Sequence, residues 1–299
     1  MSPQELEILR KKARNIFIVG FIITIILTLA SFVILKSFFS VFFVLIFGLV
    51  ITIVITSGPS KKFSLAYKET YVLKSLKSVF KDLVYEPDKG LDESIIANTG
   101  MMYMGDRYSA NDYVAGKYKN INIVQSDIRI EKREVVTDSD GNTKEEWTTI
   151  FMGRWMVFDF NKSFKANIQV CQKGFWNSKL GNWDSRNTYK KVTLEDQEFN
   201  NNFRVYAQDE HEAFYVLTPT IISKIKDLSN NISGKLLFCF VDNKLHVGIA
   251  NDSDSFEHSI FTKIDEEDIM NNISKDIKLI TNFVDELNLD NDLFKREVQ

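Results

Sequence analysis

Two long uncharged apolar runs lie near the start of the 299-residue chain, at residues 16–35 and 38–55. A helix rises about 1.5 Å per residue, so about 20 residues cross a hydrocarbon core of roughly 30 Å. The first run meets this length, and the second is short but adequate with small adjustments. Only Lys36 and Ser37 separate them. The pattern predicts a transmembrane helical hairpin over residues 16–57, in preference to a cleaved signal peptide or a buried soluble hairpin.

Basic side chains gather at the two outer ends of this predicted hairpin, whereas the connecting turn offers Lys36 alone. They are Arg10, Lys11, Lys12 and Arg14 before the first run, and Lys61, Lys62 and Lys68 after the second. The positive-inside rule therefore predicts that both termini, and the large C-terminal part, are cytoplasmic. Two isolated cysteines, Cys171 and Cys239, agree with a reducing compartment.

A basic amphipathic helix is predicted over residues 61–85, directly after the second run. Its apolar stripe is formed by Leu65, Val72, Leu76, Val79 and Leu83. The basic residues Lys61, Lys62, Lys74, Lys77 and Lys81 are candidates for contact with anionic lipid. The alternative is that the stripe packs on the soluble domain and the lysines are solvated.

Alternating apolar and polar positions predict strands over residues 114–172. Asp140-Gly141 predicts a hairpin turn between two of these runs, and Asp242-Asn243 predicts a second hairpin further on. A calcium loop at residues 138–149 is excluded, because its twelfth position is Thr149 instead of Glu. A further strand is predicted at residues 255–261, and a short helix at residues 92–102.

Two other segments leave alternatives open. The loop at residues 174–187 carries Trp176 and Trp183, which either close over a core or contact a partner or the bilayer. The last predicted helix has apolar residues stepping by 3 and 4 from Ile273 to Leu287. It is predicted to pack on the chain's own sheet, because the repeat is too short for a coiled coil.

The predicted fold class is α+β: an N-terminal two-helix transmembrane hairpin, then one cytoplasmic domain with an antiparallel β-sheet and flanking helices. The predicted organisation is a basic tail (1–15), the hairpin (16–57), a juxtamembrane helical segment (58–100) and the α+β domain (101–299). Residues 1–62 carry a net charge of +5 and the remainder −8. An acidic domain makes nucleic-acid binding improbable, because phosphate contacts dominate that affinity.

The segment from Leu194 to Pro219 concentrates acids, aromatics and a histidine, and it is interpreted as helix starts. Thr193, Asp209 and Thr218 are predicted N-caps, with Glu212 completing a capping box. A zinc-protease motif at His211 is excluded, since position 215 is Tyr.

No catalytic signature is found elsewhere either: a patterned nucleophile and a glycine-rich phosphate loop are both absent from the sequence. We therefore predict no catalytic residue, no metal site and no cofactor. His246 and His258, on predicted strands, are interpreted as ordinary polar or core residues.

Several motifs resemble those of a bacterial family of two-span membrane proteins, the domain of unknown function three-one-three-seven. They are "YEPDKGL" (residues 85–91), "RYSANDYVAGKYKNINIVQSDI" (107–128), "FMGRWMVFDFNKSF" (151–164) and the segment 194–219. The likeness spans most of residues 15–250. It departs from the family at Phe214, where a basic residue is expected. The resemblance implies the bacterial cytoplasmic (inner) membrane and supports the topology, and it brings no activity.

The sequence therefore favours a membrane-anchored cytoplasmic binding or scaffolding module with an unknown protein or small-molecule partner. One alternative is a ligand-gated membrane effector that assembles through its hairpins as a homo-oligomer, with Gly20, Ala30 and Gly48 allowing close helix contact. A membrane-bound hydrolase is a further alternative.

Overall fold

The computed structural model describes the chain except for residues 138–142, 160–164, 176–188, 288 and 290–299. The chain forms two compact units. Residues 1–76 and 256–275 make the hairpin unit, and residues 77–255 and 276–299 make the sheet unit. Trp176, Trp183 and the Asp140-Gly141 turn lie outside the described residues.

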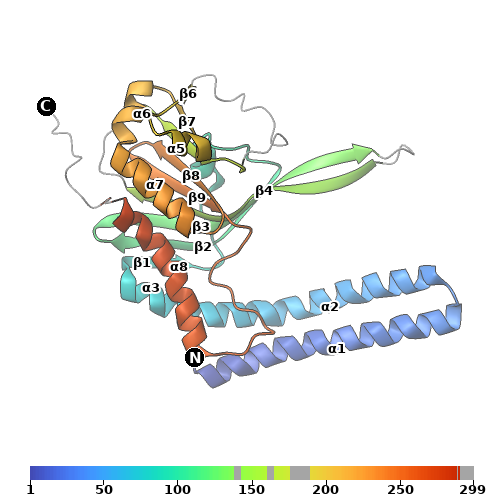
Figure 1. Ribbon diagram of the computed structural model, residues 1–299. Helices are drawn as coiled ribbons and strands as arrows, with labels where there is room; N and C mark the ends of the chain where they lie inside the picture. Colours follow the sequence, from blue (N-terminus) through green and yellow to red (C-terminus); the bar gives the residue numbers. More distant parts are fainter. Residues whose placement is uncertain (138–142, 160–164, 176–188, 288, 290–299) are drawn as a thin grey trace. The chain divides into compact units, whose positions relative to one another are not determined.

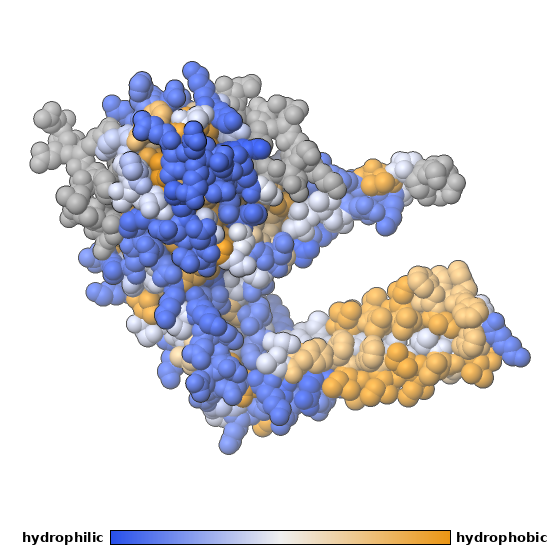
Figure 2. Space-filling model, in the orientation of Figure 1, coloured by the Kyte–Doolittle hydropathy of each residue, from blue (hydrophilic) through white to orange (hydrophobic). Residues whose placement is uncertain are grey.

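The hairpin unit is built on two long helices, α1 (Pro3–Leu35) and α2 (Phe38–Tyr67). Lys36 adopts a left-handed conformation at the turn between them, at the position where the sequence predicted a tight connection. Both helices are long and apolar enough to cross a membrane, and only 11% and 6% of their most apolar windows are buried in the protein. A core helix of a soluble protein would be mostly buried. Figure 2 shows the continuous apolar surface of this hairpin.

Small and hydroxylated residues form the contact between α1 and α2. A Cβ atom on Gly20 would lie 2.8 Å from Thr52 Cγ2, and one on Gly48 would lie 2.5 Å from Thr24 Cγ2. The hydroxyl oxygens of Thr24 and Thr52 are 3.4 Å apart. Each of these threonines also donates to the carbonyl four residues before it. Glycine at these two positions therefore lets the helices approach closely.

The helical region after the hairpin is shorter than predicted. A π-helical turn (Lys68–Val72) leads into α3 (Leu73–Val79), and strand β1 (Lys81–Glu86) follows. The prediction of one helix to residue 85 is therefore wrong. At the other end, residues 3–15, predicted as a basic tail, continue α1 as helix. Ser2 and Glu5 form a capping box at its start.

The sheet unit contains one nine-stranded antiparallel sheet in the order β1-β2-β3-β4-β9-β8-β5-β7-β6 among the described residues (Figure 1). This agrees with the predicted α+β class. The remaining strands are β2 (Arg107–Tyr118), β3 (Ile121–Thr137), β4 (Thr143–Asp159), β5 (Ile168–Gln172), β6 (Lys190–Val192), β7 (Phe203–Ala207), β8 (Lys235–Val241) and β9 (Lys244–Ala250).

Two tight turns connect neighbouring strands of the sheet. Asp242 and Asn243 both have positive φ (50° and 58°) between β8 and β9, which confirms the hairpin predicted there. Lys119 and Asn120 also have positive φ, and they join β2 to β3. The alternating pattern predicted strands across this region but did not predict this turn. Neither of its residues is glycine, although the turn requires positive φ at both positions.

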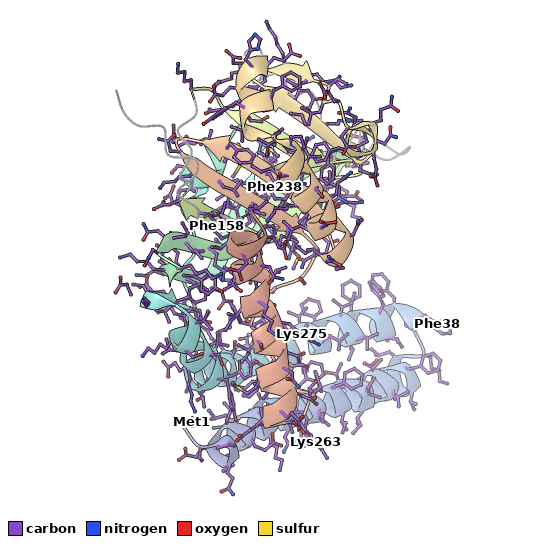
Figure 3. The ribbon with its side chains drawn as sticks, turned by 60° about the vertical axis from the view of Figure 1, so that its left-hand side comes forward. Met1, Phe38, Phe158, Phe238, Lys263 and Lys275 are labelled. Atoms are coloured by element: carbon purple, nitrogen blue, oxygen red, sulfur yellow. The ribbon has the colours of Figure 1, made fainter. Side chains whose placement is uncertain are left out.

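Helices cover one face of the sheet, and a short helical segment covers the other. On the first face lie α5 (Gln197–Asn202), α6 (Glu210–Val216), α7 (Pro219–Asn231) and the second half of α8 (Glu266–Glu286). Phe283 of α8 contacts Phe158 of β4 and Phe238 of β8 (ring centroids 6.1 and 6.2 Å). Phe158 and Phe238 are labelled in Figure 3. The predicted packing of this helix on the chain's own sheet is confirmed.

The second face is covered by α4 (Glu93–Ala97) and the residues around it. A buried cluster joins Ile96 and Met101 to Trp155 of β4 and to Leu237 of β8. Residues 251–265, between β9 and α8, form no strand. The prediction of a strand at residues 255–261 is therefore wrong.

Candidate functional site

A cavity of about 500 Å³ lies on the α4 face of the sheet. Its floor is one cross-strand row, in which Val124 of β3 pairs with Val157 of β4, and Val157 pairs with His246 of β9. Side chains alternate between the two faces of a strand, so residues in one register row share a face. The antiparallel pairing therefore brings these three distant segments of the chain together.

The residues before and within α4 form the opposite wall of the cavity, through Leu91, Asp92, Ile95 and Asn98. Leu91 is held on both sides, because its N–H donates to Ser126 Oγ (2.9 Å) and its carbonyl accepts from Tyr108 Oη (2.8 Å). Asp92 caps α4 by accepting from Ser94 N (2.8 Å). Backbone hydrogen bonds to the sheet and a helix cap thus fix this wall.

The cavity lining is mainly apolar, with polar groups at a few positions. Leu91, Ile95, Tyr113, Val124, Val157 and Val241 supply the apolar surface. Asp92, Asn98, Asp242, Lys244 and His246 supply the polar groups, of which His246 alone is buried, at 5% exposed. An apolar surface with few polar groups is typical of sites for small organic ligands.

His246 is a neutral imidazole in this environment. Burial, followed by the nearby charge of Lys244, lowers its pKa to about 4. Its Nδ1 accepts a hydrogen bond from Trp155 Nε1 (3.4 Å). Tryptophan only donates, so Nδ1 must be the unprotonated nitrogen and Nε2 carries the proton. The ring therefore offers one N–H donor in an otherwise apolar floor.

The lining gives the cavity little capacity for nucleophilic chemistry. Among the described residues that line it, none is Ser, Thr or Cys. Cys171 and Cys239 are both buried in the neighbouring core. His246 lacks the paired acid that would orient a general base, since its described hydrogen bond is to Trp155. The arrangement is suited to binding.

A buried ion pair lies elsewhere in the sheet unit, between Asp127 of β3 and Arg154 of β4. Arg154 Nε is 3.7 Å from Asp127 Oδ1, and Arg154 Nη1 donates to the carbonyl of Asp276 (2.8 Å). Asp127 accepts from the N–H and the hydroxyl of Ser255 (2.7 and 3.0 Å). Burial raises the pKa of Asp127 to about 7, despite the guanidinium. This pair holds Ser255 and Asp276, the two residues that flank the segment 256–275.

The predicted lipid-contact residues are all exposed. Lys61 and Lys62 lie on α2, and Lys74 and Lys77 lie on α3. Lys81 is the first residue of β1, so it does not continue the helical face on which it was predicted. None of these lysines lines the cavity.

The predicted caps are placed as follows. Asp209 caps α6 by accepting from His211 N (2.8 Å) and Glu212 N (3.3 Å), and Thr218 caps α7 by accepting from Ile221 N (3.4 Å). Glu212 accepts from Lys165 N (3.2 Å). Thr193 is not an N-cap, because α5 begins later, at Gln197.

Asp196 caps α5 instead of Thr193. Its carboxylate accepts from Phe199 N (2.8 Å) and pairs with Lys226 (2.9 Å). The hydrogen bond from Lys226 lowers the pKa of Asp196, and the backbone N–H of Phe199 acts in the same direction. Asp196, which is three residues closer to α5 than Thr193, therefore provides the cap.

The two remaining histidines differ from His246. His211 lies exposed at the start of α6, outside the cavity. His258, predicted on a strand, lies in the segment between β9 and α8 and stacks on Tyr67 of α2 (5.3 Å). Sequence reasoning identified none of the cavity residues as a site. The available signal was the hairpin at Asp242-Asn243, which fixes the register of His246 but says nothing of the α4 wall.

Together, the fold and the cavity define a protein with a two-helix hairpin that is able to span a membrane and an α+β domain that holds a ligand-sized space. Residues 149–289 match the model of the family described as "Protein of unknown function (DUF3137)". This match confirms the resemblance to that family. It runs from within β4 to the end of α8, and therefore includes part of the cavity floor but neither the α4 wall nor α1 and α2.

Two further comparisons bring no functional assignment. No curated protein matches this chain. The chain is similar to the solved structure entitled "crystal structure of the mycobacterial trehalose monomycolate transport factor A, TtfA", with a TM-score of 0.38 and 9% identity. That alignment covers 76% of this chain and 94% of the other. A likeness of this size supports no inference about fold or function.

Proposed function

We propose that this protein is a membrane-anchored binding module whose sheet unit takes up a small, mainly apolar molecule. The observation that carries the proposal is the cavity of about 500 Å³ with its apolar floor and a buried, neutral His246. A molecule with an apolar body would cover Val124 and Val157, and one acceptor would meet the imidazole N–H. A buried acceptor placed elsewhere would lose its hydrogen bonds to water without compensation.

Anchoring by α1 and α2 fits this role. An apolar ligand partitions into a bilayer, so a binding domain held at the membrane meets a raised local concentration of it. We place the sheet unit on the cytoplasmic side of a bacterial inner membrane, with both termini cytoplasmic. The support for this orientation is the set of basic residues at the outer ends of the hairpin, compared with the single Lys36 at its turn.

The proposed binding role of the cavity is tested by filling the cavity with a larger side chain. In a Val124→Trp variant the indole would occupy the cavity floor. Val135→Trp is a matched control on the same strand, because Val135 is 58% exposed. The full chain is purified in detergent, and its co-purifying small molecules are extracted and identified by mass spectrometry. We expect one class of apolar molecule with the wild type and Val135→Trp, and its loss with Val124→Trp.

The same extract from all three proteins would contradict the proposal. Thermal unfolding of each variant shows whether it is folded. Should Val124→Trp not fold, Ile95→Trp tests the same cavity from the α4 wall, where the side chain is only partly buried.

A second candidate function is the ligand-gated membrane effector, and the course of residues 256–275 favours it. Both residues that flank this segment are held in the sheet unit by the Asp127–Arg154 pair, and the segment itself belongs to the hairpin unit with α1 and α2. A change in the sheet at this pair would therefore act on both residues that flank the segment.

The effector proposal is tested by spin labels on Ile8 and Lys62, two exposed positions on α1 and α2. Val124→Trp serves as a mimic of the occupied cavity. A changed distance distribution in Val124→Trp but not in Val135→Trp is the expected result. Identical distance distributions would contradict the effector proposal and leave the binding-module proposal in place.

A further inference from the structure

Residues 256–264, which we call the strap, pack on both helices of the hairpin unit. Glu257 forms an ion pair with Lys68, which is 4% exposed and directly follows α2. On the other helix, the fully buried Arg10 donates from Nη1 to the carbonyl of Ile260 (2.6 Å). The strap is thus fixed to the base of α1 and to the base of α2.

Glu7 orients the Arg10 guanidinium that forms this anchor. Arg10 donates to both carboxylate oxygens of Glu7 (2.7 Å each), and this lowers the pKa of Glu7 to about 2. The Glu7 carboxylate therefore stays ionised throughout the physiological pH range. The guanidinium is held in one orientation, which leaves Nη1 directed at the strap.

The register of the helices sets the level at which the membrane surface would lie. Gly20 lies against Thr52, and Thr24 lies against Gly48. Continuing this antiparallel register places Ile16, where the first apolar run begins, opposite Thr56, directly after the second run. Both runs therefore end at one level. Five further residues of α2, about 8 Å of helix, lead to the basic residues Lys61 and Lys62.

Phe261 of the strap lies at that level. Its ring and the Phe17 ring form a T-shaped contact (5.3 Å between centroids), and Phe17 is the second residue of the first apolar run. Phe261 is nevertheless 54% exposed. Lys263, two residues further on, is also exposed, near the start of α8 (Figure 3). An aromatic ring followed by a basic residue is typical of segments that lie at a membrane interface.

We propose that the strap is a membrane-contact element, in which Phe261 inserts between the headgroups and acyl chains of the leaflet at the base of the hairpin. The exposed side of Phe261 continues the apolar surface of α1 beside Phe17, so the occupant is the lipid that surrounds α1. Lys263, Lys61 and Lys62 then face the anionic headgroups. This inference rests on the membrane-anchoring part of the proposed function and is independent of the cavity.

The proposal is tested by the depth of a fluorescent label in vesicles. Position 261 is converted to cysteine in the full chain, and an environment-sensitive dye is attached. Both native cysteines are buried, so the dye reacts at the engineered site. The protein is reconstituted in vesicles of phosphatidylcholine and phosphatidylglycerol. Nitroxide lipids quench the dye, with the nitroxide either near the headgroup or near the end of the acyl chain.

Two matched phenylalanines supply the controls. Phe214 is 43% exposed on α6 of the sheet unit, and Phe47 is 61% exposed near the middle of the second apolar run. We expect the label at 261 to be quenched several-fold more by the headgroup nitroxide than by the deep one. The label at 47 should show the reverse preference, and the label at 214 should be quenched by neither.

The three positions separate the possible failures. If 261 behaves like 214 while 47 is quenched by the deep nitroxide, the hairpin is inserted and the strap proposal is wrong. If 47 is quenched by neither lipid, the membrane anchoring itself is wrong. A label at 261 that is quenched most by the deep nitroxide would also contradict an interfacial strap, because it would place residue 261 in the hydrocarbon core.

Discussion

The hairpin and the sheet unit bury opposite kinds of side chain. Between α1 and α2, the buried residues of the apolar runs are Thr24, Thr28 and Thr52, and Thr56, directly after the second run, is also buried, while Ile, Val and Phe face outward. The sheet unit shows the opposite distribution of buried and exposed side chains. Its core consists of Phe, Trp, Ile, Leu and Val side chains, and its charged residues are mostly exposed.

This difference is expected if lipid surrounds the hairpin and water surrounds the sheet unit. In water, removing apolar surface is the main driving force for folding, so the sheet unit buries its largest apolar groups. Lipid is as apolar as leucine, so burying a leucine between two membrane helices gains little. Close backbone approach and hydroxyl hydrogen bonds remain, and these require Gly and Thr in the contact.

The largest expected effect is the loss of a phenylalanine from the core of the sheet. Phe238 is fully buried and contacts Phe283, so Phe238→Ala should lower the free energy of unfolding by about 3–5 kcal/mol. Phe47→Ala, on the outer surface of α2, should change it by about 0.5 kcal/mol or less. Denaturant unfolding of the detergent-solubilised chain measures both changes. Equal losses of unfolding free energy would contradict the contrast between the two regions.

A smaller effect is expected from the buried polar group of the sheet unit. His246 has a folded-state pKa of about 4, below the unfolded value of about 6.5. The unfolded chain therefore binds the proton first, and this contribution to stability is lost as the pH falls from about 6.5 to about 4. Between about pH 7 and about pH 5 the loss should be about 2 kcal/mol.

A His246→Gln variant isolates this contribution. Asp127 acts in the opposite direction, because its raised pKa makes the folded state bind a proton first as the pH falls through about 7. That effect is common to both proteins and cancels in their difference. Urea unfolding at the two pH values should show a difference of about 2 kcal/mol in pH dependence. Parallel pH profiles would show that His246 is not a buried neutral imidazole.

The hairpin contact should be sensitive to a single methyl group. Gly48→Ala places a Cβ atom 2.5 Å from Thr24 Cγ2, and separating the helices should cost about 1–3 kcal/mol. Gly58 lies on the same helix with no atom within 4 Å of its Cβ position, so Gly58→Ala is the matched control. Spin labels on Ile8 and Lys62 should report a longer or broader distance in Gly48→Ala alone. A change in both variants would trace the effect to helix propensity.

The smallest effect is expected at a helix cap, where water solvates the helix end. Asp196→Ala should cost about 0.5–2 kcal/mol through the lost hydrogen bond to Phe199 N. Thr193→Ala, at the position first predicted to be the cap, should cost about 0.5 kcal/mol or less. Denaturant midpoints of the two variants decide between them, and a larger loss from Thr193→Ala would reverse the assignment.

Features that depend on neighbouring residues could be predicted from the sequence. The two apolar runs and the Lys36-Ser37 turn give α1 and α2, and the Asp242-Asn243 turn gives the β8–β9 hairpin. The periodic stripe from Ile273 gives α8. Each of these depends on side chains within a turn of helix or a few residues of strand. The contact between α1 and α2 can also be predicted from the sequence, since Gly and Thr recur every four residues on both helices.

Other elements were decided by pairing with distant strands. The apolar stripe of residues 61–85 continues through Val79 and Leu83, yet the helix ends and Lys81 begins β1. Pairing of β1 with β2 and the positive φ of Asp82 (51°) override the helical period there. Residues 255–261 alternate like a strand, but Ser255 bonds the Asp127 side chain, and residues 258–261 contact α1 and α2. A local pattern does not specify which partner a segment finds.

The candidate site also depends on pairing between distant strands. Val124, Val157 and His246 come from three strands and share a row only because of the register of β3, β4 and β9. The space above them exists because α4 is held at Leu91 by Ser126 and Tyr108. The sequence by itself determined which two segments are long and apolar enough to cross a membrane, because this follows from hydrophobicity along the chain. Only the tertiary structure decided that a cavity remains, because its volume is what the packing of distant side chains leaves unfilled.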